Sequence, residues 1–422
     1  QAAPANAGVL HGQRDERIQP LHMGAGGNLG HHAAIEGVFF GLAGDALTQH
    51  GGAAILKAQD RRRGFVAAGF DPEDGERALH HCGRACTPPA KDKPRHMTST
   101  RTVRIGTRGS PLALAQANLF AELIARASGG SVATSLHPFT TTGDKILDKP
   151  LQDAGGKGLF TKELDRAQEL GEIDVAVHSL KDVTVTLPDH IYLAAFLERE
   201  DPRDCLIGPF ASIADLPHGA VVGSSSLRRQ AQLKAARPDL NVITFRGNVQ
   251  TRLRKLSEGE AQATILAAAG LRRLGMIDHA AAVLPIEDML PAGGQGIIGA
   301  TLRKDAPDWL KELLAKIDNE EARLAAIAER AFLRRLDGSC RTPIAAHFRL
   351  TEDGAEMAGE VLSDDGAKRW RAEGVIEGRP TVFDAEVLGD ALAEDVAIER
   401  SYDLDGVLPP DYAPDSEDED GA

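Results

Sequence analysis

Residues 101–127 read RTVRIGTRGSPLALAQANLFAELIARA. The apolar residues within 103–106 favour a buried β-strand, and Ser110 followed by Pro111 is typical of the start of an α-helix. We therefore predict a strand at 103–106, a turn of small residues, and a helix at 111–127. A strand that leads directly into a helix is the repeating unit of α/β folds.

The same pattern continues along the chain from Met97. Further strands are predicted at 174–178, 220–223, 241–245 and 263–267, and further helices at 159–170, 227–236, 249–257 and 320–336. This alternation indicates an α/β protein in which helices cover the sheets. The segment EDPRD at 200–204 lies between two such series, so we interpret it as a hinge between two lobes.

Beyond residue 337 the pattern becomes rich in strands. The segments 347–350, 355–362 and 368–377 alternate apolar and polar residues and are separated by EDG and DDG turns. With a last helix at 384–399, they predict a small α+β domain. The run of acidic residues at 415–420 predicts a disordered, solvated tail.

Composition excludes several classes of partner. The 422 residues suffice for two to four domains, and the net charge of −14 would repel nucleic acid and anionic membranes. Four scattered cysteines suggest a reducing compartment. We find neither a run long enough to span a membrane nor a secretory signal, so we expect a cytoplasmic protein.

The first 96 residues show little periodicity, and we expect a disordered or non-native upstream extension. An alternative is a metal site in HHCGRAC, where His80, His81, Cys82 and Cys86 could act as ligands. Their spacing does not match the common zinc motifs, so no metal site is predicted.

Arginines recur where predicted strands end. Arg108 lies in the turn after the first predicted strand, and Arg228 and Arg229 follow the second such turn, GSSSL. Arg246 follows another predicted strand, and Arg252 lies one turn into the next predicted helix. Arg272 and Arg273 follow the predicted strand 263–267. Open α/β sheets bind ligands at strand ends, and arginine suits carboxylate and phosphate groups. The pattern favours one small molecule with several such groups, although surface arginines on solvated faces are the alternative.

Three other residues are candidates for chemistry. Asp182 follows a short apolar strand in HSLKDV, where it could hold an N–H donor or simply pair with Lys181. Lys157 lies in the loop AGGKGLF, which lacks the spacing of a nucleotide-binding P-loop. Cys340 lies in the loop LDGSCRTPIAA and is either a nucleophile or attachment point, or a buried inert thiol; Cys205 is interpreted as structural.

Nine segments in one order carry a resemblance to a known family. They are IGTRGSPLALAQA, GGKGLF, VHSLKDV, EREDPRD, GSSSLRRQ, RGNVQTRL, ILAAAGLRRLG, LPAGGQGIIG and GSCRTPI. From residue 101 to about 400 the chain resembles the porphobilinogen deaminase (hydroxymethylbilane synthase) family. The resemblance implies two lobes like those of periplasmic binding proteins and a small third domain with the cofactor cysteine. Lobe 1 would comprise 97–199 and 292–316, lobe 2 200–291, the third domain 317–402 and the acidic tail 403–422.

The resemblance also implies the roles of individual residues. The cofactor would be a dipyrromethane joined by a thioether to Cys340, and Asp182 would be the catalytic residue. The cofactor would be bound by Arg108, Ser110, Lys181, Ser226, Arg228, Arg229 and Arg246. The substrate would be bound by Arg108, Lys157, Arg246, Arg252, Arg273 and Gln295.

The implied enzyme is a transferase that condenses four porphobilinogen molecules head to tail and releases ammonia, giving hydroxymethylbilane for tetrapyrrole synthesis. Asp182 would stabilise the positive charge passing through a pyrrole N–H. We expect a monomer with no nucleic acid, membrane or metal partner. Two rival interpretations are a solute-binding protein for a polycarboxylate, which lacks a secretion signal, and a phosphate-sugar transferase, which lacks a phosphate loop.

Overall fold

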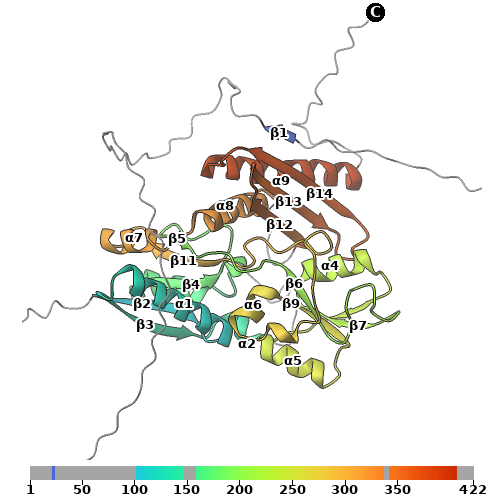
Figure 1. Ribbon diagram of the computed structural model, residues 1–422, viewed down its shortest axis with the longest axis horizontal. Coiled ribbons are helices and arrows are strands. Elements are labelled where there is room, and N and C mark those ends of the chain that lie inside the picture. The colour runs from blue at the N-terminus through green and yellow to red at the C-terminus, as the bar shows by residue number, and fades with distance from the viewer. Residues whose placement is uncertain (1–20, 24–100, 147–157, 337–341, 406–422) are drawn as a thin grey trace, which may run out of the picture. The chain divides into compact units, whose positions relative to one another are not determined.

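The computed structural model describes residues 21–23, 101–146, 158–336 and 342–405 (Figure 1). The chain divides into two compact units, Gln1–Gly26 with Thr98–Ala422, and Gly27–Met97. The second unit lies outside the described residues, and with it the HHCGRAC segment and most of the predicted upstream extension. The acidic run at 415–420 also lies outside them.

The first sheet has five strands in the order β3-β2-β4-β11-β5. Its strands are β2 (Arg101–Arg108), β3 (Val132–Phe139), β4 (Val175–Ser179), β5 (Ile191–Phe196) and β11 (Ile298–Arg303). β2 pairs in parallel with β3 and β4, whereas β11 runs antiparallel between β4 and β5. The helices of this lobe are α1 (Pro111–Ala127), α2 (Thr142–Lys145), α3 (Lys162–Glu169) and α7 (Asp308–Ala315). Buried side chains of β2, α1, β4 and α7 form one core.

The second sheet also has five strands, in the order β10-β6-β9-β7-β8. Its strands are β6 (Asp204–Ile207), β7 (Val221–Gly223), β8 (Asn241–Ile243), β9 (Ala263–Ala267) and β10 (Ala282–Val283). The helices are α4 (Leu227–Ala236), α5 (Val249–Ser257) and α6 (Ala268–Arg273), followed by the short 3-10 helix η3 (Ile277–His279). β7 pairs in parallel with β8 and β9, so turns that carry arginines leave the same edge of this sheet.

The C-terminal part combines a sheet with two helices. The strands are β12 (Ile344–Leu350), β13 (Gly354–Leu362) and β14 (Arg369–Glu377), and the helices are α8 (Glu320–Arg335) and α9 (Val382–Asp405). A short strand β1 (Leu21–Met23) pairs in parallel with β14. Figure 1 shows α8 and α9 along the antiparallel strands β12 to β14, with which they share a core. The observed architecture agrees with the predicted α/β lobes and small α+β domain.

Local chemistry explains where the helices near the site begin. Ser110 caps α1 by accepting a hydrogen bond from the Ala113 backbone N–H, and Pro111 fills the first turn. Ser226 caps α4, and Asn248 caps α5, in the same way. Each cap follows a strand-end turn, so the caps fix where the arginines that follow them leave the backbone.

Several predicted boundaries were wrong by a few residues, such as those of the last helix, predicted at 384–399 and observed at Val382–Asp405. Two of the differences have identifiable reasons. The predicted strand 241–245 ends at Ile243, because the Phe245 backbone N–H donates to the Ser225 hydroxyl (2.9 Å) rather than to a neighbouring strand. The predicted helix 159–170 begins at Lys162, because Gly158 adopts a φ of 77° and starts a turn that Thr161 closes. None of the helices in the described ranges has the length and hydropathy that crossing a bilayer requires.

Candidate active site

Asp182 lies at the C-terminal end of β4, on the short 3-10 helix η2 (Leu180–Asp182). Leu180 is fully buried, and its backbone N–H donates to the Ile297 carbonyl. These contacts fix the start of the turn that carries Asp182. The Asp182 side chain remains 30% exposed, and its Oδ2 accepts a hydrogen bond from Arg108 Nη1 at 3.3 Å. The predicted strand end therefore presents a carboxylate that a small molecule can reach.

Arg108 joins Asp182 to a second carboxylate, that of Asp144 on α2. Its Nε donates to Asp144 Oδ2 at 3.3 Å, its Nη2 pairs with Asp144 Oδ1, and its guanidinium lies 4.2 Å from the centre of the Phe160 ring. Burial alone would lower the pKa of Arg108, but the hydrogen bond to Asp144 and the charge of Asp182 outweigh it and raise the pKa. Arg108 is thus a fixed cation, and its partner Asp144 was not predicted from the sequence.

Arg228 and Arg229 converge on the buried carboxylate of Asp204. Arg229 Nη2 lies 2.6 Å from Asp204 Oδ1 and Arg228 Nη2 lies 2.8 Å from Oδ2, while Asp204 is fully buried. The two guanidinium charges hold the pKa of Asp204 well below its usual range, against the opposing effect of burial. Asp204 was also missed, although a charged residue directly before the apolar run CLI was a visible signal.

Backbone and amide groups complete the surroundings of the two arginines. Arg228 Nη1 donates to the Leu290 carbonyl (2.7 Å) and to Gln232 Oε1 (3.1 Å), and Arg229 Nη1 donates to the Ile265 carbonyl (3.0 Å). The Nε atoms of both arginines are buried and have no hydrogen-bond partner among the described residues. These unsatisfied donors are of the kind that an anionic ligand would satisfy.

Gln295 connects Lys181 of lobe 1 with the Asp204 carboxylate of lobe 2. Lys181 Nζ donates to Gln295 Oε1 at 3.1 Å, and Gln295 Nε2 donates to Asp204 Oδ1 at 2.8 Å. Burial, followed by the charge of Arg229, lowers the pKa of Lys181 to about 8. The side chain of Gln295 therefore lies between a lysine of lobe 1 and a carboxylate of lobe 2, and these two hydrogen bonds fix its orientation.

Arg252 and Arg273 are two further cations, both half-buried. Arg252 Nε donates to the Gly247 carbonyl at 3.0 Å, and burial together with the charges of Arg229 and Arg246 lowers its pKa to about 10. Arg246 is itself buried. Arg273 Nη2 donates to the Gly296 carbonyl at 2.6 Å, and burial lowers its pKa to about 10 as well.

Electrostatic coupling shows which predicted residues lie together. Asp182 acts on Arg108, Lys181 and Arg252, and Arg229 acts on Lys181 and Arg252. Ser110 and Ser226 lie at the helix starts beside Arg108 and Arg229, where their hydroxyls act as caps. Arg273 is coupled instead to Glu200 in the predicted hinge. The predicted residues Lys157 and Cys340 lie outside the described residues.

The arrangement favours binding of a molecule with several carboxylates. Five cations are buried or mutually coupled here, and among the described residues the carboxylates that oppose them are those of Asp182, Asp204 and Glu360; the cations are Lys181, Arg228, Arg229, Arg246 and Arg252. Buried like charges repel one another, so a ligand whose anionic groups neutralise them would bind favourably. No set of three or more His, Cys, Asp or Glu side chains in the described ranges could hold a metal ion.

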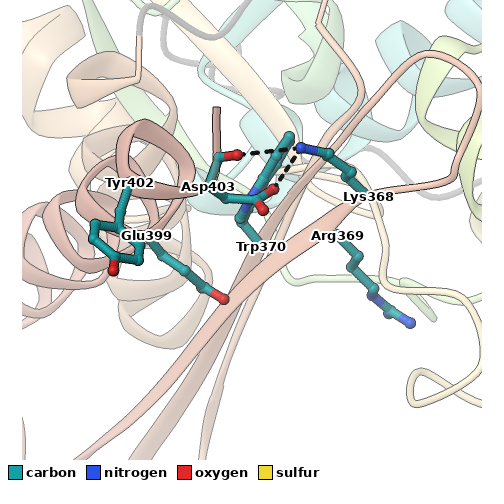
Figure 2. Close-up of a pocket in the computed structure, with 6 residues that line it drawn as sticks. All are labelled: Lys368, Arg369, Trp370, Glu399, Tyr402 and Asp403. Carbon is teal, nitrogen blue, oxygen red and sulfur yellow. Dashed lines mark hydrogen bonds and ion pairs between the residues drawn. The ribbon is translucent and has the colours of Figure 1, made fainter. Parts of the chain in front are cut away.

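Two other features lie apart from this cluster. Cys205 is fully buried, and burial raises the pKa of its thiol to about 11, which agrees with the structural interpretation. Figure 2 shows an open groove between β14 and the end of α9, whose residues carry both signs of charge, including an ion pair of Lys368 with Asp403. None of the predicted site residues lines this groove.

Comparisons with known proteins add independent information. Two family models match the chain: porphobilinogen deaminase, dipyromethane cofactor binding domain, over residues 103–311, and porphobilinogen deaminase, C-terminal domain, over residues 323–397. A porphobilinogen deaminase of Paracoccus denitrificans (strain Pd 1222) is 49% identical over 296 residues, which is 70% of this chain and 93% of that protein. A chloroplastic porphobilinogen deaminase of Pisum sativum is 51% identical over 287 residues, 66% of this chain and 77% of that protein.

Among solved structures, a TRAP periplasmic solute binding protein from Desulfovibrio salexigens DSM2638 is 10% identical, with 74% of this chain and 99% of that chain covered. Its TM-score is 0.35, which is too low to support a conclusion about this chain.

Proposed function

The chain belongs to the porphobilinogen deaminase family, and we propose that Asp182 is its catalytic carboxylate and Cys340 the attachment point of its cofactor. The reaction is the stepwise head-to-tail condensation of four porphobilinogen molecules with release of ammonia. It gives hydroxymethylbilane for tetrapyrrole biosynthesis, so the protein is a transferase.

The cofactor is a dipyrromethane, and the charge balance of the site fits it. Its acetate and propionate groups would meet the cations that now repel one another, and the unpaired Nε donors of Arg228 and Arg229 would gain acceptors. When bound, the dipyrromethane supplies the pyrrole that primes the condensation. The residues that would hold it are Arg108, Ser110, Lys181, Ser226, Arg228, Arg229 and Arg246.

Two observations support attachment of the cofactor at Cys340: the other cysteines are poor candidates, and Cys340 lies within a matched family region. Cys205 is buried with a raised thiol pKa, so it is a poor nucleophile. Cys82 and Cys86 lie outside both matched family regions, whereas Cys340 lies within the one at 323–397. A thioether at Cys340 would join the cofactor to the C-terminal domain.

The carboxylate of Asp182 performs one defined task in this proposal. As ammonia leaves porphobilinogen, positive charge develops on the substrate pyrrole and is shared with its N–H. Asp182 accepts a hydrogen bond from that N–H and so stabilises the charge. Its Oδ1 is available for this bond because it makes no hydrogen bond within the described ranges, whereas Oδ2 is held by Arg108. Lys157, Arg252, Arg273 and Gln295, together with Arg108 and Arg246, would bind the substrate carboxylates.

The remaining parts of the proposal concern the protein as a whole. We propose lobe 1 at 97–199 and 292–316, lobe 2 at 200–291, a cofactor-anchoring domain at 317–402 and an acidic tail at 403–422. The segment 1–96 would be an extension dispensable for activity, its strand β1 adding only three residues at the edge of the C-terminal sheet. The protein would act as a cytoplasmic monomer without nucleic-acid or membrane partners, and its net charge of −14 disfavours binding to nucleic acid and anionic membranes.

The proposal rests above all on the partly exposed carboxylate of Asp182 among the half-buried cations Arg108, Lys181 and Arg252, and substitution of Asp182 tests it. Asp182→Asn keeps the shape and removes the charge, so turnover should fall by about a hundredfold or more while the melting temperature is kept. Asp182→Glu should retain some activity. If Asp182 only paired with a neighbouring cation, Asp182→Asn would form hydroxymethylbilane at a nearly normal rate.

A further inference from the structure

Arg330 on α8 binds the chain segment that directly follows Asp182. Its Nη2 donates to the carbonyls of Thr184 at 2.8 Å and of Val185 at 3.0 Å, and its Nη1 donates to that of Val183 at 3.3 Å. One half-buried guanidinium therefore holds three consecutive peptide groups. The first of them belongs to the residue next to Asp182.

No carboxylate in the described ranges pairs with Arg330, which distinguishes it from its neighbours on α8. Arg334 pairs with Glu386 and Asp390, and Arg335 pairs with Glu394, all on α9. Burial, with a contribution from Arg334, lowers the pKa of Arg330 to about 10. A cation that is desolvated without a counter-ion needs other acceptors, and here backbone carbonyls supply them.

The segment 183–187 lacks regular secondary structure that would satisfy these carbonyls. Within the described ranges the segment makes two other hydrogen bonds. The Val183 backbone N–H donates to the Leu180 carbonyl, and the Thr184 hydroxyl donates to the Thr186 carbonyl (2.8 Å). Both bonds lie inside the segment or its turn and do not tie it to the rest of the protein. Arg330 supplies that tie, and the burial of Leu180 and Val183 in the core that contains Phe332 of α8 reinforces it.

We propose that Arg330 is a positioning residue that fixes the Asp182 carboxylate relative to α8. The proposal rests on the catalytic role proposed for Asp182. Without the three hydrogen bonds, residues 183–185 would have alternative conformations, and Asp182 would lose its alignment with the substrate N–H. Because small misplacements of a catalytic group lower the rate strongly, the effect falls on turnover more than on substrate binding.

A double-mutant cycle in turnover tests this coupling. Arg330→Gln should lower kcat about tenfold and change KM by less than about twofold. In the Asp182→Asn background the same substitution should lower kcat by less than about twofold, because the group that Arg330 positions is already disabled. Arg330→Lys should be intermediate, because one ammonium group cannot match the fork of a guanidinium.

Arg335→Gln is the matched control, because Arg335 lies on the same helix but forms an exposed pair with Glu394. It should leave kcat unchanged. Hydrogen exchange gives a second measurement that does not depend on activity: Arg330→Gln should speed exchange in 183–187 and leave α8 protected. If Arg330→Gln cannot be purified folded, the cycle and the exchange measurement are made with Arg330→Lys.

Equal losses of kcat in both backgrounds would overturn the proposal, because they would show that Arg330 acts independently of Asp182. An unchanged kcat, or faster exchange throughout the protein, would overturn it too. If Asp182→Asn alone proved almost fully active, the catalytic role itself would fail, whereas a slow Asp182→Asn with additive losses would refute only the role of Arg330.

Discussion

Arg108 places one guanidinium between two carboxylates that come from different parts of lobe 1. Asp144 binds it through two nitrogens, and Asp182 accepts from the remaining one. The planar fork makes this sharing possible, because its donors point in fixed directions. Arg108 therefore holds the Asp182 carboxylate from the strand side.

Replacement of Arg108 by lysine should separate this geometric role from simple charge. Arg108→Lys keeps the charge but cannot bind both carboxylates as a fork, so kcat/KM should fall by about tenfold or more with little change in melting temperature. Arg104→Lys is the control, since Arg104 lies on the same strand and pairs with Asp174 before β4 begins. Equal activity of both variants in a steady-state assay would contradict the role given to Arg108.

At this scale the sequence indicated which charged residues lie at or just after strand ends better than it indicated their ion-pair partners. Arg108, Arg228 and Asp182 stand at strand ends, and strand ends are recognisable from local periodicity. Asp144 and Asp204 were missed because their partners lie 36 and about 25 residues away in sequence, and ion pairing between distant residues leaves no local pattern. Cys340 and Lys157 remain predictions, since both lie outside the described residues.

Among the elements, α8 connects the C-terminal domain to both the hinge and the site. Its Glu329 is fully buried, pairs with Arg199 at 2.6 Å, and accepts from the backbone N–H groups of Gly294 and Phe348. These partners belong to the segment before the predicted hinge, to the Gln295 loop and to β12. One carboxylate thereby holds three chain segments at the start of the C-terminal domain.

Glu329→Gln should therefore destabilise the protein strongly. It leaves the Arg199 charge buried without a counter-ion, and such losses cost about 3–5 kcal/mol of unfolding free energy. Glu320→Gln, in the first turn of the same helix and paired on the surface with Arg379, should change stability little. Urea unfolding of both variants measures this, and equal midpoints would mean that Glu329 does not hold the domain.

Sequence periodicity predicted α1, α4 and α5 with the observed bounds, because each begins at a cap and presents a helical pattern. It could not give the partners of strands. β11 pairs antiparallel with β4 and β5 although more than a hundred residues separate it from either. Such pairing depends on the whole chain, and the place of this segment in lobe 1 was expected only from the family resemblance.

At the scale of the whole molecule, two buried histidines make stability depend on pH. Burial lowers the pKa of His178 to about 4 and that of His347 to about 3, whereas both would be near 6.5 in the unfolded chain. The unfolded state then binds more protons below 6.5. Stability from these groups is complete above pH 6.5 and is lost as the pH falls toward their folded pKa values.

Between pH 7 and 4.5 the unfolding free energy should therefore fall by roughly 2–3 kcal/mol per histidine, before most carboxylates protonate. Urea unfolding at successive pH values measures the slope. His347→Gln removes one titrating group and should flatten the slope by about half, even if it lowers stability at pH 7. An unfolding free energy that stays constant across this range would exclude neutral, buried histidines.

The intact mass of the purified active protein tests most directly whether a dipyrromethane is joined covalently to Cys340. We predict an added mass of two porphobilinogen molecules less two molecules of ammonia, located by peptide mapping at Cys340 and coloured by Ehrlich's reagent. Cys340→Ser should fold, carry no added mass and be inactive. An active protein whose Cys340 is unmodified would contradict the account.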